Sequence, residues 1–295
     1  MKQKVVVLGS RGMLGHLVLA VLGGDSRLDT LGIGRRSNAC GIFFDVENAA
    51  ESLNRLEGAI GNIDYIINCI GITANQIDEN NPESARRAMV VNAFFPQEMA
   101  RWARNKKTKI LSISSDGVFE NNGGRFFEDS PIAPEDVYGR SKALGEVVEN
   151  AVLNIRCSII GPSPHNHRSL YEWVNQHAEN SVIKGYTNHF WNGITTLEYA
   201  EFCRRIILKD LFKKLRKKNH VFHLAPRAAV SKYELLVLLK NISGKKLDIV
   251  PVKNGENSKG RILKTKYSIM SILLPKINLE EALKMLKIQT KKVNK

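Results

Sequence analysis

The sequence predicts an α/β fold in which a doubly wound parallel sheet is combined with a smaller C-terminal domain. In the first half of the chain, short continuous apolar runs alternate with longer helical patterns, which is typical of strands covered on both faces by crossover helices. A glycine-rich turn joins the first apolar run to the first helical segment. After residue 161 the chain becomes rich in proline, histidine, asparagine and aromatic residues, which indicates an insertion that forms a binding cleft.

The predicted elements alternate along the chain. Apolar runs predict strands at residues 5–9, 29–34, 64–71, 109–115 and 153–161. Helical spacing predicts helices at residues 13–24, 48–60, 83–106 and 135–151. Beyond the insertion we expect a helix at 196–209, a strand at 221–225 and a helix at 232–243. We therefore assign residues 1–160, joined by about 195–225, to the sheet domain, and residues 161–194 and 226–295 to the second domain.

The chain has 295 residues and a net charge of +15. A charge of this size suggests nucleic acid or an anionic surface as a partner. However, residues 1–200 carry 20 Lys and Arg against 22 Asp and Glu, whereas residues 201–295 carry 24 against 7. The densest basic run, residues 208–220, has apolar side chains at helical spacing, so it is a solvated helix face or, as the alternative, a phosphate-binding patch. No nucleic-acid-binding motif accompanies the lysines, and we expect no nucleic-acid partner.

Cysteine usage indicates a reducing compartment. Cys40, Cys69, Cys157 and Cys203 are far apart, lie in apolar surroundings and form no C-x-x-C pair. The N-terminal apolar run is too short for a signal peptide, and no stretch is long enough to cross a bilayer. We therefore expect a cytoplasmic protein without membrane insertion. The two histidines of the segment HNH in the insertion have no cysteine or carboxylate at metal-binding spacing, so no metal site is expected.

Gly9, Gly12 and Gly15 form the pattern G-x-x-G-x-x-G between the first strand and the first helix. Glycine permits a tight turn there and lets the backbone approach a pyrophosphate, which the helix N-terminus attracts. This context predicts a Rossmann-type dinucleotide site.

The second strand ends in Arg35 and Arg36 instead of a carboxylate. Because arginine pairs with a 2′-phosphate, we favour NADPH and keep NADH as the alternative.

Tyr138 and Lys142 are four residues apart in a predicted helix, so they share one helix face. An ammonium beside a phenol stabilises the phenolate and is expected to lower the pKa of Tyr138 toward the working range of an acid–base catalyst. Ser115, at the end of the preceding strand, is placed to hydrogen-bond a substrate carbonyl oxygen. These three residues are the predicted catalytic group.

Together these motifs resemble the extended short-chain dehydrogenase/reductase family, and most of the chain is similar to its dTDP-4-dehydrorhamnose reductase type. The resemblance is carried by the glycine pattern and by the segments INCIGIT (67–73), SISSDGVF (112–119) and YGRSK (138–142). The longer segments FEDSPIAPEDVYGRSKALGE, VNAFFPQEMARWA and FHLAPRAAVSKYELL strengthen it. Coverage is weakest from about residue 242 to the end.

The resemblance implies an NADPH-dependent oxidoreductase that reduces the 4-keto group of a nucleotide-linked 6-deoxyhexose in surface-polysaccharide biosynthesis. A homodimer is one open alternative for the oligomeric state. The predicted cofactor site combines the positions that the resemblance implies with the glycine and arginine positions above: Gly9, Ser10, Arg11, Gly12, Met13, Leu14, Gly15, Arg35, Arg36, Asp45, Val46, Cys69, Ile70, Gly71, Asn92, Tyr138, Lys142 and Ser158. The predicted substrate site adds side chains of the insertion to those near the catalytic group: Thr73, Ser115, Asp116, Arg168, Trp173, Lys184 and Trp191. The alternative for the two tryptophans is packing under the loop.

The chain departs from this reductase type beside the catalytic serine. Where the type has threonine, aspartate and tyrosine, this chain has Ser115, Asp116 and Gly117. The missing aromatic side chain is expected to open the pocket to a bulkier sugar substituent, such as the acetamido group of a UDP-2-acetamido-2,6-dideoxy-4-hexulose. Gly117 also replaces the glutamate that related dehydratases use, which argues against dehydration. Two alternatives remain: a nucleotide-sugar 4-epimerase with bound NAD, and a non-catalytic regulatory subunit on the same fold.

Overall fold

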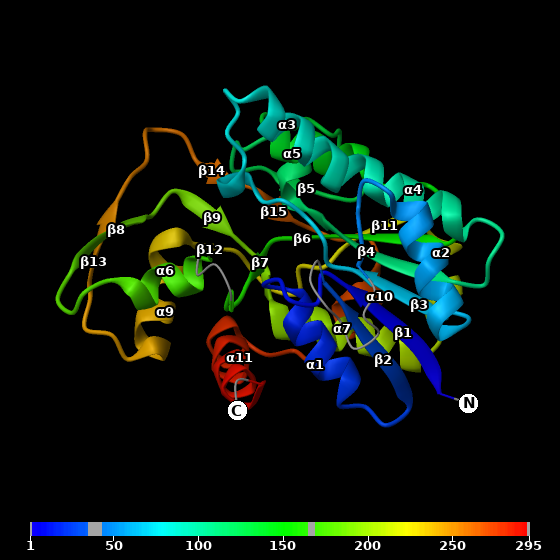
Figure 1. Cartoon of the computed structure of the whole chain (residues 1–295). Coiled ribbons are helices and arrows are strands. Elements are labelled where there is room, and N and C mark those ends of the chain that lie inside the picture. Colours follow the sequence, from blue (N-terminus) through cyan, green and yellow to red (C-terminus); the bar gives the residue numbers. More distant parts are fainter. Residues whose placement is uncertain (1, 35–42, 165–168, 294–295) are drawn as a thin grey trace.

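A six-stranded parallel sheet, in the order β11-β6-β4-β3-β1-β2, forms the centre of the molecule (Figure 1). The computed structural model describes residues 2–34, 43–164 and 169–293. Several residues singled out from the sequence lie outside this described part of the chain: Arg35, Arg36, Cys40, His165, His167 and Arg168. The observed sheet confirms the predicted fold class.

The strands of the central sheet are β1 (Gln3–Leu8), β2 (Leu28–Ile33), β3 (Tyr65–Asn68), β4 (Lys109–Ser115), β6 (Val152–Cys157) and β11 (Val221–His223). Chain order reverses at β1, which pairs with β2 on one side and with β3 on the other. In open parallel sheets the crevice at such a reversal, beyond the carboxyl ends of the strands, is where ligands bind.

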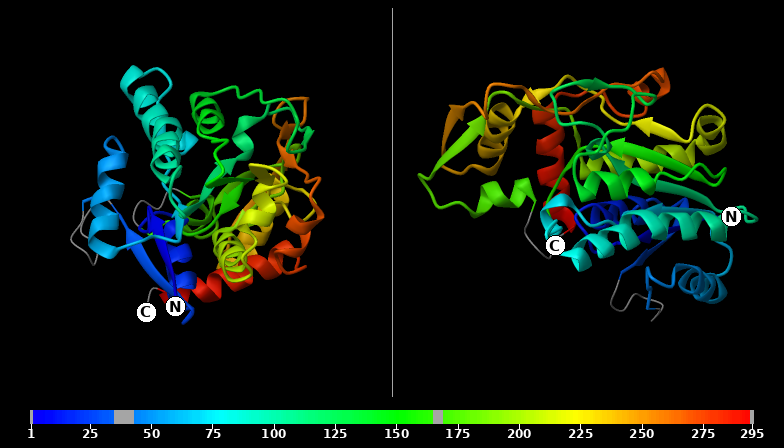
Figure 2. Two further views of the ribbon diagram at one scale, coloured as in Figure 1. Left: turned by 90° about the vertical axis from the view of Figure 1, so that its right-hand side faces the viewer. Right: turned by 90° about the horizontal axis from the view of Figure 1, so that it is seen from above.

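Alternating side chains of β1 face two helix layers, which explains why the strand is one unbroken apolar run. Val5 and Val7 face a cluster with α1 (Gly15–Gly23) and α7 (Thr196–Leu208). Val6 and Leu8 face a second cluster with α2 (Ala49–Ile60) and α4 (Phe95–Ala103). Figure 2 shows the cyan helix layer and the yellow-green α7 on opposite sides of the sheet.

The smaller region packs on the carboxyl-end side of the sheet. Its apolar cluster includes Leu17 in the first turn of α1. It is built from α6 (Leu170–Gln176), β8 (Val182–Tyr186), β9 (His189–Trp191), β12 (Val230–Ser231), α9 (Lys232–Ser243), β13 (Asp248–Val252), β14 (Lys259–Gly260) and α11 (Leu279–Val293). Here β8 pairs with β13, and β9 pairs with β12 and β14.

Shorter elements complete the described part of the chain. The strands are β5 (Arg125–Phe126), β7 (Ile159–Ile160), β10 (Ile194–Thr195) and β15 (Ile262–Leu263). The helices are α3 (Pro82–Met89), α5 (Val137–Leu144), α8 (Phe212–Arg216) and α10 (Ser268–Ile272), with the short turns η1 (Ala74–Gln76), η2 (Val90–Phe94) and η3 (Asp116–Val118). None of the helices in the described ranges is long and apolar enough to cross a membrane.

Two predicted helices differ from the structure. The helix expected at residues 83–106 is α3 and α4 joined by η2, a π-helical turn. Pro96 has no N–H to continue the α-helical ladder there. The helix expected at 135–151 ends at Leu144, because Gly145 packs against this turn: a Cβ on Gly145 would lie 2.0 Å from the carbonyl oxygen of Asn92.

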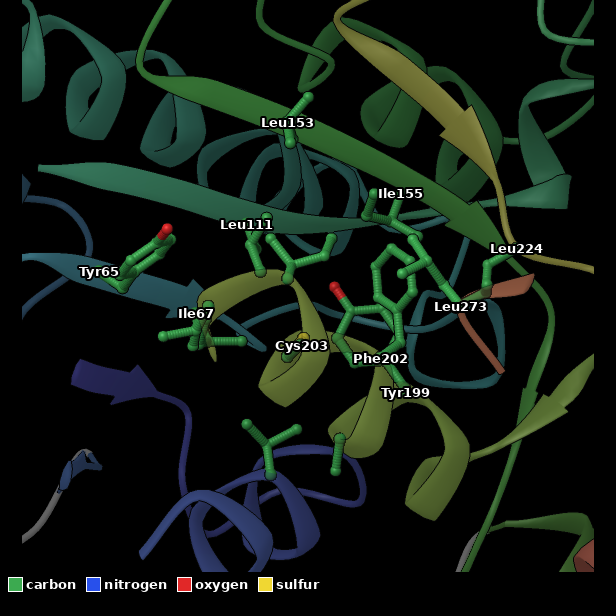
Figure 3. Packing of buried hydrophobic residues seen from close by; sticks show 14 of the residues in the cluster. Tyr65, Ile67, Leu111, Leu153, Ile155, Tyr199, Phe202, Cys203, Leu224 and Leu273 are labelled. Carbon is green, nitrogen blue, oxygen red and sulfur yellow. The ribbon is translucent and has the colours of Figure 1, made fainter. Parts of the chain in front are cut away.

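Replacing Phe202 with alanine is expected to lower the free energy of unfolding by about 3–5 kcal/mol. The Phe202 side chain is fully buried and packs with Tyr199, Leu224 and Leu273 between α7 and the sheet (Figure 3). Urea denaturation followed by circular dichroism measures the change. Phe94→Ala is the control: its side chain is 63% exposed, so a change within about 0.5 kcal/mol is expected. Equal effects of the two changes would contradict the assigned core.

Candidate active site

The glycine turn brings the start of α1 close to β1. Gly9 has a φ of 78°, and a Cβ there would lie 3.0 Å from Cγ1 of Ile70. A Cβ on Gly15 would lie 2.1 Å from the carbonyl oxygen of Gly9, and one on Gly12 would lie 3.3 Å from it. No side chain of the described residues caps α1 at Leu14. Its first N–H groups can therefore be satisfied by an anion, and the space over the turn suits a pyrophosphate.

A cavity of about 660 Å³ lies over the carboxyl ends of the strands. The glycine turn, the ends of β3 and β4, and α5 form one side of it, and the smaller region forms the other. Its lining includes Gly12, Met13, Leu14, Cys69, Gly71, Thr73, Ser115, Asp116, Tyr138, Lys142, Cys157, Ser158, Trp191 and Lys232. A volume of this size lies within the usual range of small-molecule and cofactor sites.

The predicted catalytic residues converge on this cavity from β4 and α5. Tyr138 and Lys142 both line it from α5, and Ser115 lines it from the end of β4. The Ser115 hydroxyl accepts a hydrogen bond from the Gly117 N–H at 3.0 Å and donates to Asp116 Oδ1 at 3.1 Å. Lys142 Nζ donates to the carbonyl oxygen of Ile113 at 2.6 Å. A phenol, a hydroxyl and an ammonium therefore face one space.

The pKa of Tyr138 is shifted in the direction opposite to the sequence expectation. Burial raises the pKa of the phenol, while its hydrogen bond with Ser115 lowers it in part and the Asp116 charge raises it further. Burial also lowers the pKa of Lys142 to about 8, against the effect of the nearby Glu146 carboxylate. The net shift of the Tyr138 pKa is therefore upward, opposite to the expectation, and Tyr138 holds its proton at neutral pH.

Some of the predicted cofactor residues line the cavity, and others lie outside its lining, among them Gly9, Ser10, Arg11, Gly15 and Val46. The residues that line the cavity are Gly12, Met13, Leu14, Cys69, Gly71, Tyr138, Lys142 and Ser158. Others support the site without lining it: Ile70 contacts Gly9, and buried Asn92 exchanges two hydrogen bonds with the Ile72 backbone. Asp45 accepts from the Glu47 N–H and from Asn48, as a turn residue does, and it lies outside the cavity lining.

The predicted substrate residues are divided by the structure. Thr73, Ser115, Asp116 and Trp191 line the cavity, and Trp191 Nε1 donates to Ser158 Oγ at 2.8 Å. Two others do not line it in the described part of the chain. Trp173 is 40% exposed and packs edge-on against the ring of His177, and Lys184 is exposed on β8.

Lys232 lines the cavity and was missed by the sequence reasoning. It is the first residue of α9, directly after the cap in which Ser231 and Glu234 exchange hydrogen bonds. Burial lowers the pKa of Lys232, while the charge of Asp116 raises it. The spacing S-x-x-E could have located the start of this helix, but no local signal shows which way the helix points.

Gly117 does not open the cavity as the sequence suggested. It is buried and lies outside the cavity lining. A Cβ on Gly117 would lie 3.0 and 3.2 Å from two ring carbons of Tyr138. The aromatic ring of Tyr138 therefore covers this position, and a larger residue there would press on Tyr138 rather than on a ligand.

Known proteins that resemble this chain include reductases of the type that the sequence motifs indicate. A family model described as the RmlD substrate binding domain matches residues 3–285. A dTDP-4-dehydrorhamnose reductase of Streptomyces griseus is 40% identical over 91 residues, which are 30% of this chain and 28% of that protein. A probable low-salt glycan biosynthesis reductase of Haloferax volcanii is 30% identical over 148 residues, which are 48% of this chain and 46% of that protein. The chain thus spans less than half the length of these relatives.

Solved structures resemble the chain over nearly its whole length. A dTDP-4-dehydrorhamnose reductase of Bacillus anthracis in complex with NADP has a TM-score of 0.80 and 20% identity, and covers 98% of this chain and 100% of its own. A UDP-glucuronic acid 4-epimerase of Bacillus cereus in complex with NAD has a TM-score of 0.68 and 18% identity, with coverage of 99% and 100%. At these identities the likeness shows the fold.

Proposed function

Because the chain belongs to the RmlD substrate binding domain family, we propose that it is a short-chain reductase that uses a nicotinamide cofactor to reduce the 4-keto group of a nucleotide-linked 6-deoxyhexose. The observation that carries this proposal is the convergence of Ser115, Tyr138 and Lys142 on one cavity. The glycine turn borders the same cavity at Gly12. A cofactor held at the turn and a sugar held at the hydroxyls would thus share one space.

NADPH is the proposed cofactor, with NADH as the alternative. The tight, uncapped turn at the start of α1 suits a pyrophosphate, and one reductase of similar fold is in complex with NADP. Arg35 and Arg36, which favour the 2′-phosphate, lie outside the described residues. When bound, the cofactor supplies a hydride to the sugar carbon.

The chain's own residues would handle the oxygen of the sugar carbonyl. Burial keeps the Tyr138 phenol protonated at neutral pH, so its O–H can give a proton to an oxygen that gains negative charge. The Ser115 hydroxyl lies beside it and can donate to the same oxygen when it turns away from Asp116 Oδ1, to which it donates in this structure. Lys142 is charged below a pKa of about 8, so its field favours both the developing alkoxide and the phenolate that remains.

One assay tests this function. Oxidation of NADPH and NADH is followed with dTDP- and UDP-linked 4-keto-6-deoxy sugars, with and without a 2-acetamido group. Because Gly117 lies outside the cavity lining, it does not select for the acetamido sugar, and the panel compares both. Stoichiometric cofactor oxidation is expected. The matching 4-hydroxy nucleotide sugars are added with NAD, and interconversion of their 4-epimers without net cofactor oxidation would instead support the 4-epimerase. Turnover of no sugar would contradict both.

Replacing Lys232 with methionine is expected to raise KM for the nucleotide sugar about tenfold, with a smaller effect on kcat. Its ammonium lines the cavity opposite Asp116, where we propose that it pairs with the substrate diphosphate. Initial rates at saturating NADPH measure the change. Lys240→Met, in the last turn of the same helix and outside the cavity lining, is the control. Equal KM values for the two variants would remove Lys232 from the site.

Replacing Gly117 with alanine is expected to lower kcat about tenfold with little change in KM. The new methyl group would press on the ring of Tyr138 and displace its hydroxyl. Gly58→Ala in α2 is the control, because a Cβ there meets no atom within 4 Å, and it should leave kcat unchanged. Unchanged kcat in Gly117→Ala would show that the phenol tolerates the displacement.

A further inference from the structure

A buried carboxylate lies directly behind the proposed catalytic group. Glu146 follows the end of α5, four residues after Lys142, and its side chain is 5% exposed. Its two oxygens accept hydrogen bonds from Nε and Nη2 of Arg156, each at 2.7 Å. Ser114 Oγ donates to the same carboxylate at 2.5 Å. Glu146 therefore joins α5 to β4 and β6 at once.

Lys142 and Glu146 form hydrogen bonds with consecutive residues of β4. Lys142 donates to the carbonyl oxygen of Ile113, and Glu146 accepts from the Ser114 hydroxyl. The next residue of the strand is Ser115, whose hydroxyl faces the cavity. The two contacts thus fix the end of β4 against α5 immediately before the reacting hydroxyl.

Arg156 extends this arrangement along the sheet to its edge strand β11, where it pairs with His223. It lies opposite Ser114 in the pairing of β4 with β6. Its Nη1 donates to the carbonyl oxygen of Glu128 at 3.2 Å and contacts Nε2 of His223 at 3.3 Å. Burial lowers the pKa of His223 to about 4, so this imidazole is neutral at neutral pH. The Arg156 charge is therefore balanced by Glu146, through two charge-assisted bonds.

We propose that Glu146 is a positioning residue for the reduction: held by Arg156 and Ser114, it keeps Lys142 charged and in place beside Tyr138. This inference rests on the proposed function. An ion pair that only joined three elements would be a weak source of stability when buried, because desolvation offsets the attraction. Because this ion pair lies one helical turn from Lys142, we assign it the role of positioning Lys142.

The charged groups around Lys142 determine in which direction its pKa shifts when the Glu146 charge is removed. Burial lowers the pKa of Lys142, and Glu146 is the carboxylate that raises it, with Cys157 of β6 as a further group. Four further titratable groups line the same cavity: Tyr138 on the same helix, Asp116 from η3, Cys69 after β3 and Lys232 of α9. Without the Glu146 charge, the pKa of Lys142 falls further. The ammonium is then lost at a lower pH, and activity declines earlier as the pH rises.

Two variants separate this role from a structural one. Glu146→Gln removes the charge but leaves Arg156 buried without a counter-charge, which is expected to destabilise the fold. The double variant Glu146→Gln with Arg156→Met removes both charges and is expected to keep the fold. It is still expected to lower the pKa of Lys142, because Glu146 raises that pKa and Arg156 is not among the groups that shift it. Glu149→Gln is the matched control: Glu149 bonds Arg104 at 2.6 Å at the surface of the same segment.

The readouts are kcat from pH 6 to 9 and the pH midpoint of Lys142 acetylation by acetic anhydride, measured by mass spectrometry. In the double variant we expect the loss in kcat to be about tenfold greater at pH 8.5 than at pH 6.5, and the acetylation midpoint to move to lower pH. Glu149→Gln should match the wild type. A loss of kcat by one factor at every pH, with an unchanged midpoint, would overturn the proposal. The acetylation midpoint needs no turnover, so it tests Glu146 even if no sugar is reduced.

Discussion

Replacing Tyr138 with phenylalanine is expected to lower kcat by about a thousandfold while the affinity for NADPH stays the same. The phenol is the group that can hand a proton to the sugar oxygen, because it lines the cavity and is protonated at neutral pH. Phenylalanine keeps the ring that covers Gly117, so the shape of the cavity is preserved. Cofactor oxidation under saturating substrate gives kcat, and tryptophan fluorescence gives the NADPH affinity.

The matched control for this change is Tyr171→Phe on α6. Burial also raises the pKa of Tyr171, but this residue lies outside the cavity lining. Its variant should keep kcat within about twofold, since surface and half-buried substitutions away from a site change little. If Tyr138→Phe retained a tenth of the wild-type kcat, Tyr138 would not be the proton donor.

The sheet could be predicted because its signals are local. The inner strands β1 and β3 lie between helix layers, so the sequence shows them directly as short runs of mostly apolar residues. Gly9 and Gly15 also mark the first turn, since close backbone approach there excludes larger residues. These features depend on a few neighbouring residues, which is why pattern alone was sufficient for them.

The end of α5 could not be predicted, because it depends on a contact across the fold. Helical spacing continues past residue 145 in the sequence, but Gly145 meets the Asn92 carbonyl oxygen of a π-helical turn. The early end of the helix turns Glu146 inward toward Arg156. The buried ion pair of Glu146 and Arg156 could therefore not be predicted from the sequence, although the sequence contains both residues.

The substrate side was the least predictable part of the site. The insertion lines one side of the cavity through Ser163, Ser169, Leu170 and Trp191. Residue type alone could not show that Trp173 and Lys184 lie elsewhere, or that Lys232 at the start of α9 lines the cavity. The direction of each side chain there is set by how β9, β12 and α9 pack, which is a property of the whole region.

Replacing Gly12 with aspartate is expected to weaken NADPH binding at least about a hundredfold, or about 2.7 kcal/mol. Gly12 lines the cavity, and a Cβ there would lie 3.3 Å from the Gly9 carbonyl oxygen, so a side chain fits with a small adjustment. Gly15 is different, because a Cβ there would overlap the same oxygen at 2.1 Å and break the turn. A carboxylate at Gly12 would therefore repel the pyrophosphate in a protein that still folds.

Titration calorimetry with NADPH measures this change, and two controls separate charge from shape. Gly12→Ala adds only the methyl group, so it should weaken binding by less than about tenfold. Gly23→Asp places the same charge near the other end of α1, where a Cβ meets no atom within 4 Å, and it should leave the NADPH affinity unchanged. Equal losses in Gly12→Ala and Gly12→Asp would mean that bulk alone closes the site. Full NADPH affinity in Gly12→Asp would place the pyrophosphate away from α1, and the proposed cofactor position would be wrong.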